Sequence, residues 1–148
     1  MKVVVACDHA GFPLKKIAIE TIRACGHEVV ESETYNTDPV DYPDITEKAC
    51  RMIQRGEVDR GVVLCGSGVG ACIAANKLKG IRAGLCHDTY SGHQGVEHDN
   101  MNVLCLVGRI IGVEPAKEII RAFLSVEFST DERHRRRVGK VMKLEAEG

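Results

Sequence analysis

Short apolar runs alternate with helical patterns along nearly the whole chain. The apolar runs, most of them rich in Val, Ile or Leu, predict strands at 2–7, 27–31, 61–64, 82–86 and 102–107. Apolar residues at helical spacing predict helices at 13–25, 45–55, 69–77, 89–97, 113–124 and 133–147. Strands that alternate with helices favour a parallel sheet covered on both faces. We therefore predict a three-layer α/β/α, Rossmann-like fold with a five-stranded parallel sheet, right-handed crossovers and an extra C-terminal helix.

The length of 148 residues predicts a single domain, 1–148. Its charged last segment, 130–148, follows the final strand and helix, and we expect this arm to pack on a partner subunit. No apolar run is long enough to cross a membrane. The net charge of -1 creates no overall field that would recruit nucleic acid or a membrane surface. We expect neither partner.

The cysteines favour a reducing compartment. There are 7 of them, an odd number, and no two stand in a CxxC arrangement. Such residues are typically free, small hydrophobic side chains in a cytoplasmic protein. We expect a cytoplasmic location, with no disulfide framework and no zinc site.

A glycine-rich turn follows the third predicted strand. Cys65 ends that strand, Gly66-Ser67-Gly68-Val69-Gly70 forms the turn, and a helix begins directly after it. Unpaired N–H groups at a helix start attract negative charge, and glycine lets the backbone approach a ligand closely. The turn lacks the lysine of a P-loop and departs from the dinucleotide-binding fingerprint. It predicts an anion cradle with a thiol at its mouth, suited to a base or a nucleophile.

Polar residues also follow the other strands. Because ligands bind beyond the carboxyl ends of parallel strands, we expect these residues to gather at one edge of the sheet. They are Cys7 to Gly11 after the first strand, Cys86 to Asp88 after the fourth, and Gly108-Arg109 after the fifth. Arg109 suits bidentate recognition of a phosphate.

Several motifs have a structural explanation beside the functional one. Asp8-His9 is either a capping Asp with a solvated His, or a pair that holds a sugar hydroxyl and a phosphate. Asp41 and Pro43 suit helix initiation, while Tyr42 leans over the site in the functional interpretation. The segment from Glu97 to Asn102 is either turn chemistry or the place of a general acid or base, His98.

The basic run from Arg133 to Arg137 also leaves alternatives open. It is either a solvated helix face, a weak nucleic-acid patch, or part of a phosphate site. Arg133 and Arg137 stand four residues apart, so they share one helix face and suit a single phosphate between them.

The chain resembles the ribose-5-phosphate isomerase B / galactose-6-phosphate isomerase family of sugar-phosphate isomerases. The resemblance covers nearly the whole chain. The motifs that carry it, in order, are Cys7-Asp8-His9-Ala10-Gly11-Phe12, Asp41-Tyr42-Pro43, Cys65-Gly66-Ser67-Gly68-Val69-Gly70, Ile73-Ala74-Ala75-Asn76-Lys77, Gly80-Ile81-Arg82-Ala83, His98 before Asn102-Val103-Leu104, Gly108-Arg109-Ile110-Ile111-Gly112, and Arg133-His134 with Arg137.

The resemblance implies an aldose–ketose isomerase that works through a cis-enediolate without metal or cofactor. It implies Cys65 as the base between C1 and C2, since Ala71-Cys72 occupy the region where some members carry a glutamate. It implies Ser67 and the loop amides as donors to the enediolate oxygen, and His98, helped by Asp8, as the group that opens the furanose ring. His9, Arg109, Arg133 and Arg137 would hold the phosphate. The implied substrate-binding set is Asp8, His9, Tyr42, Gly66, Ser67, Gly68, Val69, Gly70, Asp99, Arg109, Arg133, His134 and Arg137.

Family members are dimers or tetramers whose active sites draw on two subunits. The resemblance thus implies a homodimer or a dimer of dimers with shared sites and a sugar phosphate as ligand. Two departures from the family pattern concern this site. Asp99 stands where many members have Asn, and Asp131-Glu132 replaces a common Gly-Gly with one extra residue, which leaves the register of the arm open. The segment from His87 to Tyr90 has no assigned role.

The leading hypothesis is interconversion of ribose 5-phosphate and ribulose 5-phosphate, a step of the pentose phosphate pathway. A second hypothesis is isomerisation of a six-carbon substrate, allose 6-phosphate or galactose 6-phosphate. A third is a non-catalytic, sugar-phosphate-binding regulatory subunit. The six-carbon enzyme would differ in its preference among sugar phosphates, and the regulatory subunit would bind without turnover.

Overall fold

A five-stranded parallel sheet forms the centre of the computed structural model, which describes residues 1–32 and 39–148. The strand order is β2-β1-β3-β5-β4, and every pair is parallel. The strands are β1 (Lys2–Cys7), β2 (Glu28–Glu31), β3 (Arg60–Cys65), β4 (Ala83–Leu85) and β5 (Val103–Val107). The three central strands are buried almost throughout, which explains why they are continuous apolar runs in the sequence. The predicted three-layer, Rossmann-like fold is confirmed.

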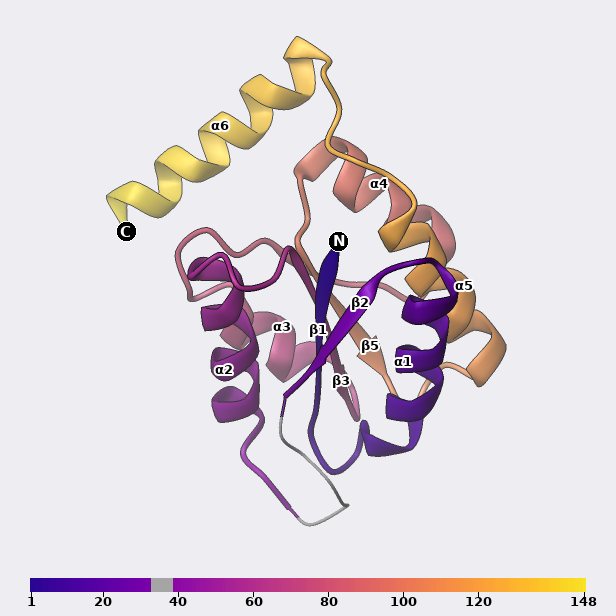
Figure 1. Cartoon of the computed structure of the whole chain (residues 1–148). Coiled ribbons are helices and arrows are strands. Elements are labelled where there is room, and N and C mark those ends of the chain that lie inside the picture. Colours follow the sequence, from indigo (N-terminus) through magenta and orange to yellow (C-terminus); the bar gives the residue numbers. More distant parts are fainter. Residues whose placement is uncertain (33–38) are drawn as a thin grey trace.

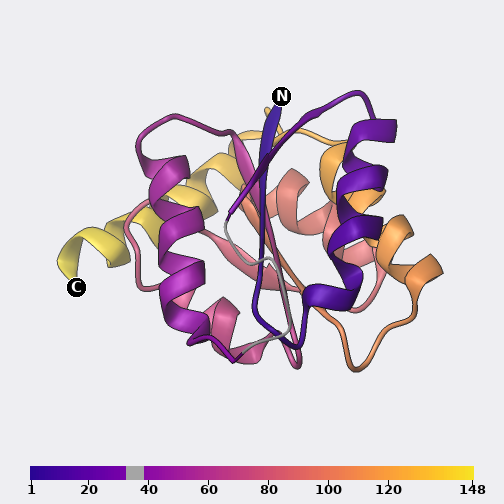
Figure 2. The same cartoon turned by 60° about the horizontal axis from the view of Figure 1, so that its bottom comes forward.

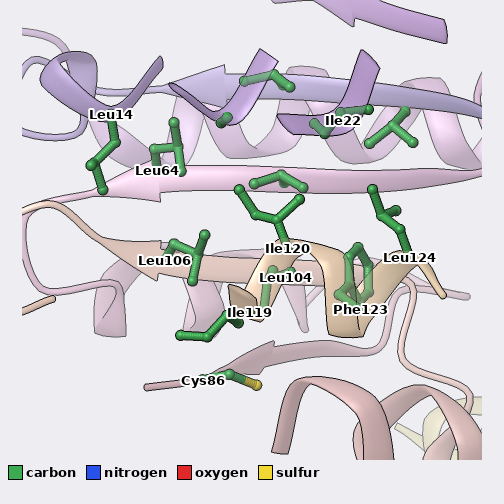
Figure 3. Close-up of a cluster of buried hydrophobic side chains, with 14 of the residues drawn as sticks. Leu14, Ile22, Leu64, Cys86, Leu104, Leu106, Ile119, Ile120, Phe123 and Leu124 are labelled. Atoms are coloured by element: carbon green, nitrogen blue, oxygen red, sulfur yellow. The ribbon is translucent and has the colours of Figure 1, made fainter. Parts of the chain in front are cut away.

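Helices cover both faces of the sheet (Figure 1, Figure 2). On one face lie α1 (Lys15–Ala24) and α5 (Val113–Leu124), and on the other lie α2 (Tyr42–Gln54) and α3 (Val69–Ala75). Each face has its own core. Figure 3 shows the larger one, in which Leu64, Leu104 and Leu106 of the sheet meet Ile22 of α1 and Phe123 of α5. Valines and small residues of the strands fill the smaller core under α2 and α3.

Two further helices complete the fold, and the earlier one contributes Val96 to the larger core. The helix α4 (Thr89–Asp99) packs beside α5, and α6 (Glu132–Glu147) contacts α4. Figure 1 shows α6 extending away from the sheet, on the side where the chain begins. Among the helices of the described ranges, none is long and apolar enough to cross a membrane.

Some predicted boundaries were wrong by a few residues. The helix α2 begins at Tyr42 rather than at 45, because Pro43 fits the first turn of a helix and Asp41 takes the N-cap position. The helix α4 continues to Asp99 rather than stopping at 97, and Asn100 ends it with a left-handed φ of 53°. His98 therefore lies on a helix, not in the turn before β5. The helix predicted at 13–25 begins as a 3-10 turn, η1 (Phe12–Leu14), and α3 stops at Ala75.

Arg60 ties the sheet to the end of α5. Its guanidinium donates hydrogen bonds to the carbonyl oxygens of Phe123 at 2.6 Å and Val126 at 2.8 Å, in a partly buried setting. We predict that Arg60→Met lowers the free energy of unfolding by about 2–4 kcal/mol, because both carbonyls lose a charged donor. Urea unfolding followed by circular dichroism measures this change. Arg55→Met, which breaks an exposed pair with Glu57, is the matched control and should leave the midpoint unchanged.

Candidate active site

A cavity of about 230 Å³ lies where the sheet connections diverge. The chain leaves β1 toward β2 on one side, whereas β3 has β5 and β4 on its other side. The loops after β1 and β3 separate at this point, where α/β sheets bind ligands. The cavity is lined by Asp8, His9, Ala10, Tyr42, Cys65, Gly66, Ser67, Gly70, Ala71 and Arg109.

Cys65 is the thiol of this cavity. It ends β3 and is only 4% exposed. Burial raises the pKa of Cys65 above its ordinary value, and the nearby negative charge of Asp8 raises it further. The N–H groups of Gly68 and Ala71 point to the sulfur and act in the opposite direction. The arrangement thus holds a weakly acidic thiol, while two amides stand ready to stabilise its thiolate form.

The glycine turn has the shape that its sequence predicts. Gly68 is the N-cap of α3 with φ of +78°, a conformation that side chains rarely adopt. Gly70 gives room to an aromatic ring, since a Cβ there would lie 2.7 Å from Cζ of Tyr42. The ring of Tyr42 thus lies against the turn at the wall of the cavity.

Asp8 fits both interpretations of its motif. Its Oδ1 accepts a hydrogen bond from the N–H of Gly11 at 2.8 Å, which stabilises the turn after β1. The same side chain lines the cavity and is 8% exposed. His9 follows it, and its Nδ1 is buried without a hydrogen-bond partner in the described part of the chain. Because a buried polar atom is usually paired, this orphan nitrogen suits a bound ligand.

Arg109 and Ser67 complete the cavity with exposed polar groups. The N–H of Arg109 donates to the carbonyl of Gly66, so the loop after β5 is fixed against the glycine turn. A cation and a hydroxyl thus share one cavity with the thiol. Sequence reasoning missed Ala10 and Ala71 as lining residues. The signal for Ala71 is its position in the first turn of α3, where N–H groups have no partner within the helix.

A second cluster contains the predicted site residues of α4 and α6. His98 and Asp99 lie in the last turn of α4, and the ring of His134 on α6 stacks on that of His98 with centroids 4.0 Å apart. Arg133 and Arg137 are exposed on α6, one helical turn apart. Arg133 also forms an ion pair with Asp131 at 3.1 Å.

A single chain does not bring the two clusters together. Asn102 accepts a hydrogen bond from Gly61 at the amino end of β3, whereas Cys65 is paired with Val107 at the carboxyl end. The four residue steps from Gly61 to Cys65 separate these levels by about 13 Å. His98 precedes Asn102 and lies near the amino-end level. The four predicted phosphate ligands are divided as well, with His9 and Arg109 in the cavity and the two arginines of α6 in the second cluster.

Helix capping explains two acidic features of the sequence, Asp131-Glu132 and the aspartate of the segment from His87 to Tyr90. Asp131 is the N-cap of α6 and accepts a hydrogen bond from the N–H of Arg133 at 2.9 Å, and Glu132 places a further acidic group in the first turn. Asp88 caps α4 in the same way through the N–H of Ser91, at 2.7 Å. The structure therefore explains the acidic residues at the start of the arm by helix initiation.

Comparison with known proteins identifies the family. The model of the ribose/galactose isomerase family matches residues 3–141. The chain belongs to this family. It is 38% identical over 144 residues to ribose-5-phosphate isomerase B of Escherichia coli strain K12. The aligned region covers 97% of this chain and 96% of the relative. The predicted resemblance and the class of sugar-phosphate isomerase are thus confirmed.

Solved structures agree with this assignment. The type B ribose 5-phosphate isomerase from Trypanosoma cruzi superposes with a TM-score of 0.97 at 39% identity and covers 100% of both chains. Ribose-5-phosphate isomerase B from Mycoplasma genitalium, solved with bound ribulose 5-phosphate, has a TM-score of 0.91 at 35% identity and covers 99% of this chain and 97% of its own.

Proposed function

We propose that this family member interconverts ribose 5-phosphate and ribulose 5-phosphate, with Cys65 as the base. The observation that carries the proposal is the buried thiol at the end of β3, which faces two backbone amides at the start of α3 in a cavity with a cation and an imidazole nitrogen that has no partner. Relatives with the same fold are ribose-5-phosphate isomerases, one with ribulose 5-phosphate bound. The direct test is an assay of both sugar phosphates in both directions with the reduced protein. Absence of interconversion would overturn the proposal.

The chemistry needs one base and one anion site. The Cys65 thiolate removes the proton from C2 of the open-chain aldose, and the electron pair forms the C1=C2 bond while the carbonyl oxygen becomes an enediolate. The proton on O2 then moves to O1, and return of the carbon-bound proton from the thiol to C1 gives the ketose and restores the thiolate. Ser67 and the N–H groups of the glycine turn stabilise the enediolate oxygen, an interaction typically worth about 100-fold or more in rate.

The remaining predicted residues have complementary roles in this proposal. His98, helped by Asp8, opens the furanose ring before the proton transfer. His9, Arg109, Arg133 and Arg137 bind the phosphate, and Tyr42, Asp99 and His134 contribute to the substrate site. The reaction belongs to the pentose phosphate pathway, and the seven free thiols suit a reducing cytoplasm.

We further propose that the site is shared between two copies of the chain. Among the described residues, those that line the Cys65 cavity do not include His98, the proposed ring-opening acid, and the cluster on α4 and α6 does not include Cys65. A homodimer in which α4 and α6 of one subunit reach the partner's cavity supplies both. Exposed apolar side chains support such a contact, with Val69 and Ile73 beside the cavity and Val141 and Leu144 on α6.

The pH dependence of catalysis follows from the raised pKa of Cys65. Because burial disfavours the thiolate, its fraction at neutral pH is small and grows as pH rises. We predict that the exchange of the C1 proton of ribulose 5-phosphate with solvent, which needs Cys65 but no ring opening, becomes faster with pH through the neutral and into the alkaline range. Asp8→Asn removes a negative neighbour and lowers the pKa of Cys65. The pH profile should therefore move to lower pH, even if the substitution also changes the maximum rate. A thiolate absorbance titration of the wild type minus Cys65→Ser measures the same ionisation, and a flat profile from neutral to alkaline pH would contradict the prediction.

A further inference from the structure

The imidazole of His98 is held on two sides. Nε2 of Gln94, one helical turn earlier on α4, lies 3.1 Å from Nδ1 of His98. The ring of His134 covers one face at 4.0 Å with an angle of 23° between the planes. His134 is itself only 7% exposed, so this wall is fixed by packing. Within the described residues, Nε2 of His98 makes no hydrogen bond and is accessible to solvent. It remains the open edge of the ring.

A glutamine at this position holds the ring in either protonation state. Its NH₂ donates to Nδ1 of the neutral ring, whose proton is then on Nε2. After the amide turns over, its oxygen accepts from the N–H of a protonated ring. The neighbouring pair on the same helix differs, because the partner of His93 is the carboxylate of Glu97 at 3.1 Å, which only accepts. Gln94 thus orients His98 without adding charge.

We infer that Gln94 is a positioning residue for ring opening, and this inference rests on the proposed function. Protonated His98 gives the proton on Nε2 to the ring oxygen of ribose 5-phosphate. The C1–O bond breaks with its electron pair on that oxygen, the C1 hydroxyl passes its proton to the carboxylate of Asp8, and the aldehyde forms. The oxygen of Gln94 accepts from Nδ1 throughout, so that Nε2 stays directed outward.

The test separates ring opening from the proton transfer at carbon. Ribulose 5-phosphate carries its phosphate on O5 and forms no furanose ring, so exchange of its C1 proton with D₂O requires Cys65 but no ring opening. We expect Gln94→Met to lower kcat/KM for ribose 5-phosphate about 10- to 100-fold, the cost of a misdirected group. The exchange into ribulose 5-phosphate, followed by NMR, should stay within about 2-fold of the wild type, because Gln94 has no part in it. Glu97→Gln on the same helix is the matched control and should leave both rates unchanged.

Gln94→Glu gives a conservative rescue. Its carboxylate has the same length and accepts from Nδ1 of the protonated ring, so we expect a kcat/KM well above that of Gln94→Met. Equal losses in turnover and exchange, no loss in either, or a Glu variant no better than Met would each overturn the inference. If the wild type itself neither turns over ribose 5-phosphate nor exchanges ribulose 5-phosphate, the proposed function fails instead. If Gln94→Met does not fold, as judged by circular dichroism, the Glu variant decides: its turnover must fall relative to its exchange, or the inference fails.

Discussion

Replacing Cys65 with serine is expected to lower kcat for ribose 5-phosphate by about 1,000-fold or more, because a hydroxyl is far too weak an acid to supply the base. The substitution should leave the shape of the cavity unchanged, because serine is close to cysteine in size and Cys65 is only 4% exposed. Binding of ribose 5-phosphate should therefore persist. Isothermal titration calorimetry measures the binding, and a coupled assay measures the turnover.

Cys25→Ser is the matched control for this experiment. Cys25 is a free, half-buried thiol at the C-cap of α1, outside the cavity, and its loss should leave kcat unchanged. Loss of a general base typically costs about 100-fold or more in rate. A Cys65→Ser variant that keeps about a tenth or more of the activity would therefore show that the thiol is not the base. Loss of binding together with turnover would point to a structural role of Cys65. Binding by the wild type without any turnover would favour the regulatory subunit.

Substrate choice separates the two enzymatic hypotheses. An enzyme for allose 6-phosphate or galactose 6-phosphate would show a higher kcat/KM for the six-carbon substrate than for ribose 5-phosphate, because discrimination is the ratio of these constants. The relatives named above are ribose 5-phosphate isomerases, which favours the five-carbon substrate. A panel of pentose and hexose phosphates under one set of conditions decides between them.

The cavity was predictable from the sequence because its signals are local. Cys65 and the glycine turn are continuous in the chain, and Asp8 and Arg109 follow other strands that end at the same edge of a parallel sheet. Alternation of strands and helices was enough to predict that edge. The helix boundary at Asp99 was not predictable in the same way, since polar residues such as His98 suit a turn as well as a helix end.

The second cluster depends on contacts that leave no local signal. The stacking of His134 on His98 requires α6 to pack against α4, and the two helices are separated in the chain by β5 and α5. The hydrogen bond from Gln94 becomes visible only when the helix is known to continue past 97. Parallel topology does predict that 97–102, which precede β5, lie at the amino edge of the sheet. What it cannot supply is the partner subunit that would bring this edge to Cys65.

A shared site makes a further strong prediction, that two inactive variants restore activity when they are combined. Cys65→Ser keeps His98, and His98→Ala keeps Cys65. In a heterodimer of these subunits, one site combines both intact residues and the other combines both substitutions. Since a two-fold dimer has two equivalent sites, we expect the purified heterodimer to show about half of the wild-type activity per dimer, against about a thousandth for either variant alone.

Co-expression with two different affinity tags allows the heterodimer to be isolated by tandem purification. The control is a heterodimer of Cys65→Ser with Cys65→Ser/His98→Ala, which has no subunit with the thiol and should remain inactive. If no heterodimer is recovered, or if it is as inactive as its parents, the two clusters do not form one site. The structure then leaves Cys65 without the ring-opening acid, because about 13 Å of β3 separates the thiol from the level at which His98 lies. Restored activity would show that the basic arm and α4 complete the partner's cavity, which is the arrangement that the exposed Val141 and Leu144 of α6 favour.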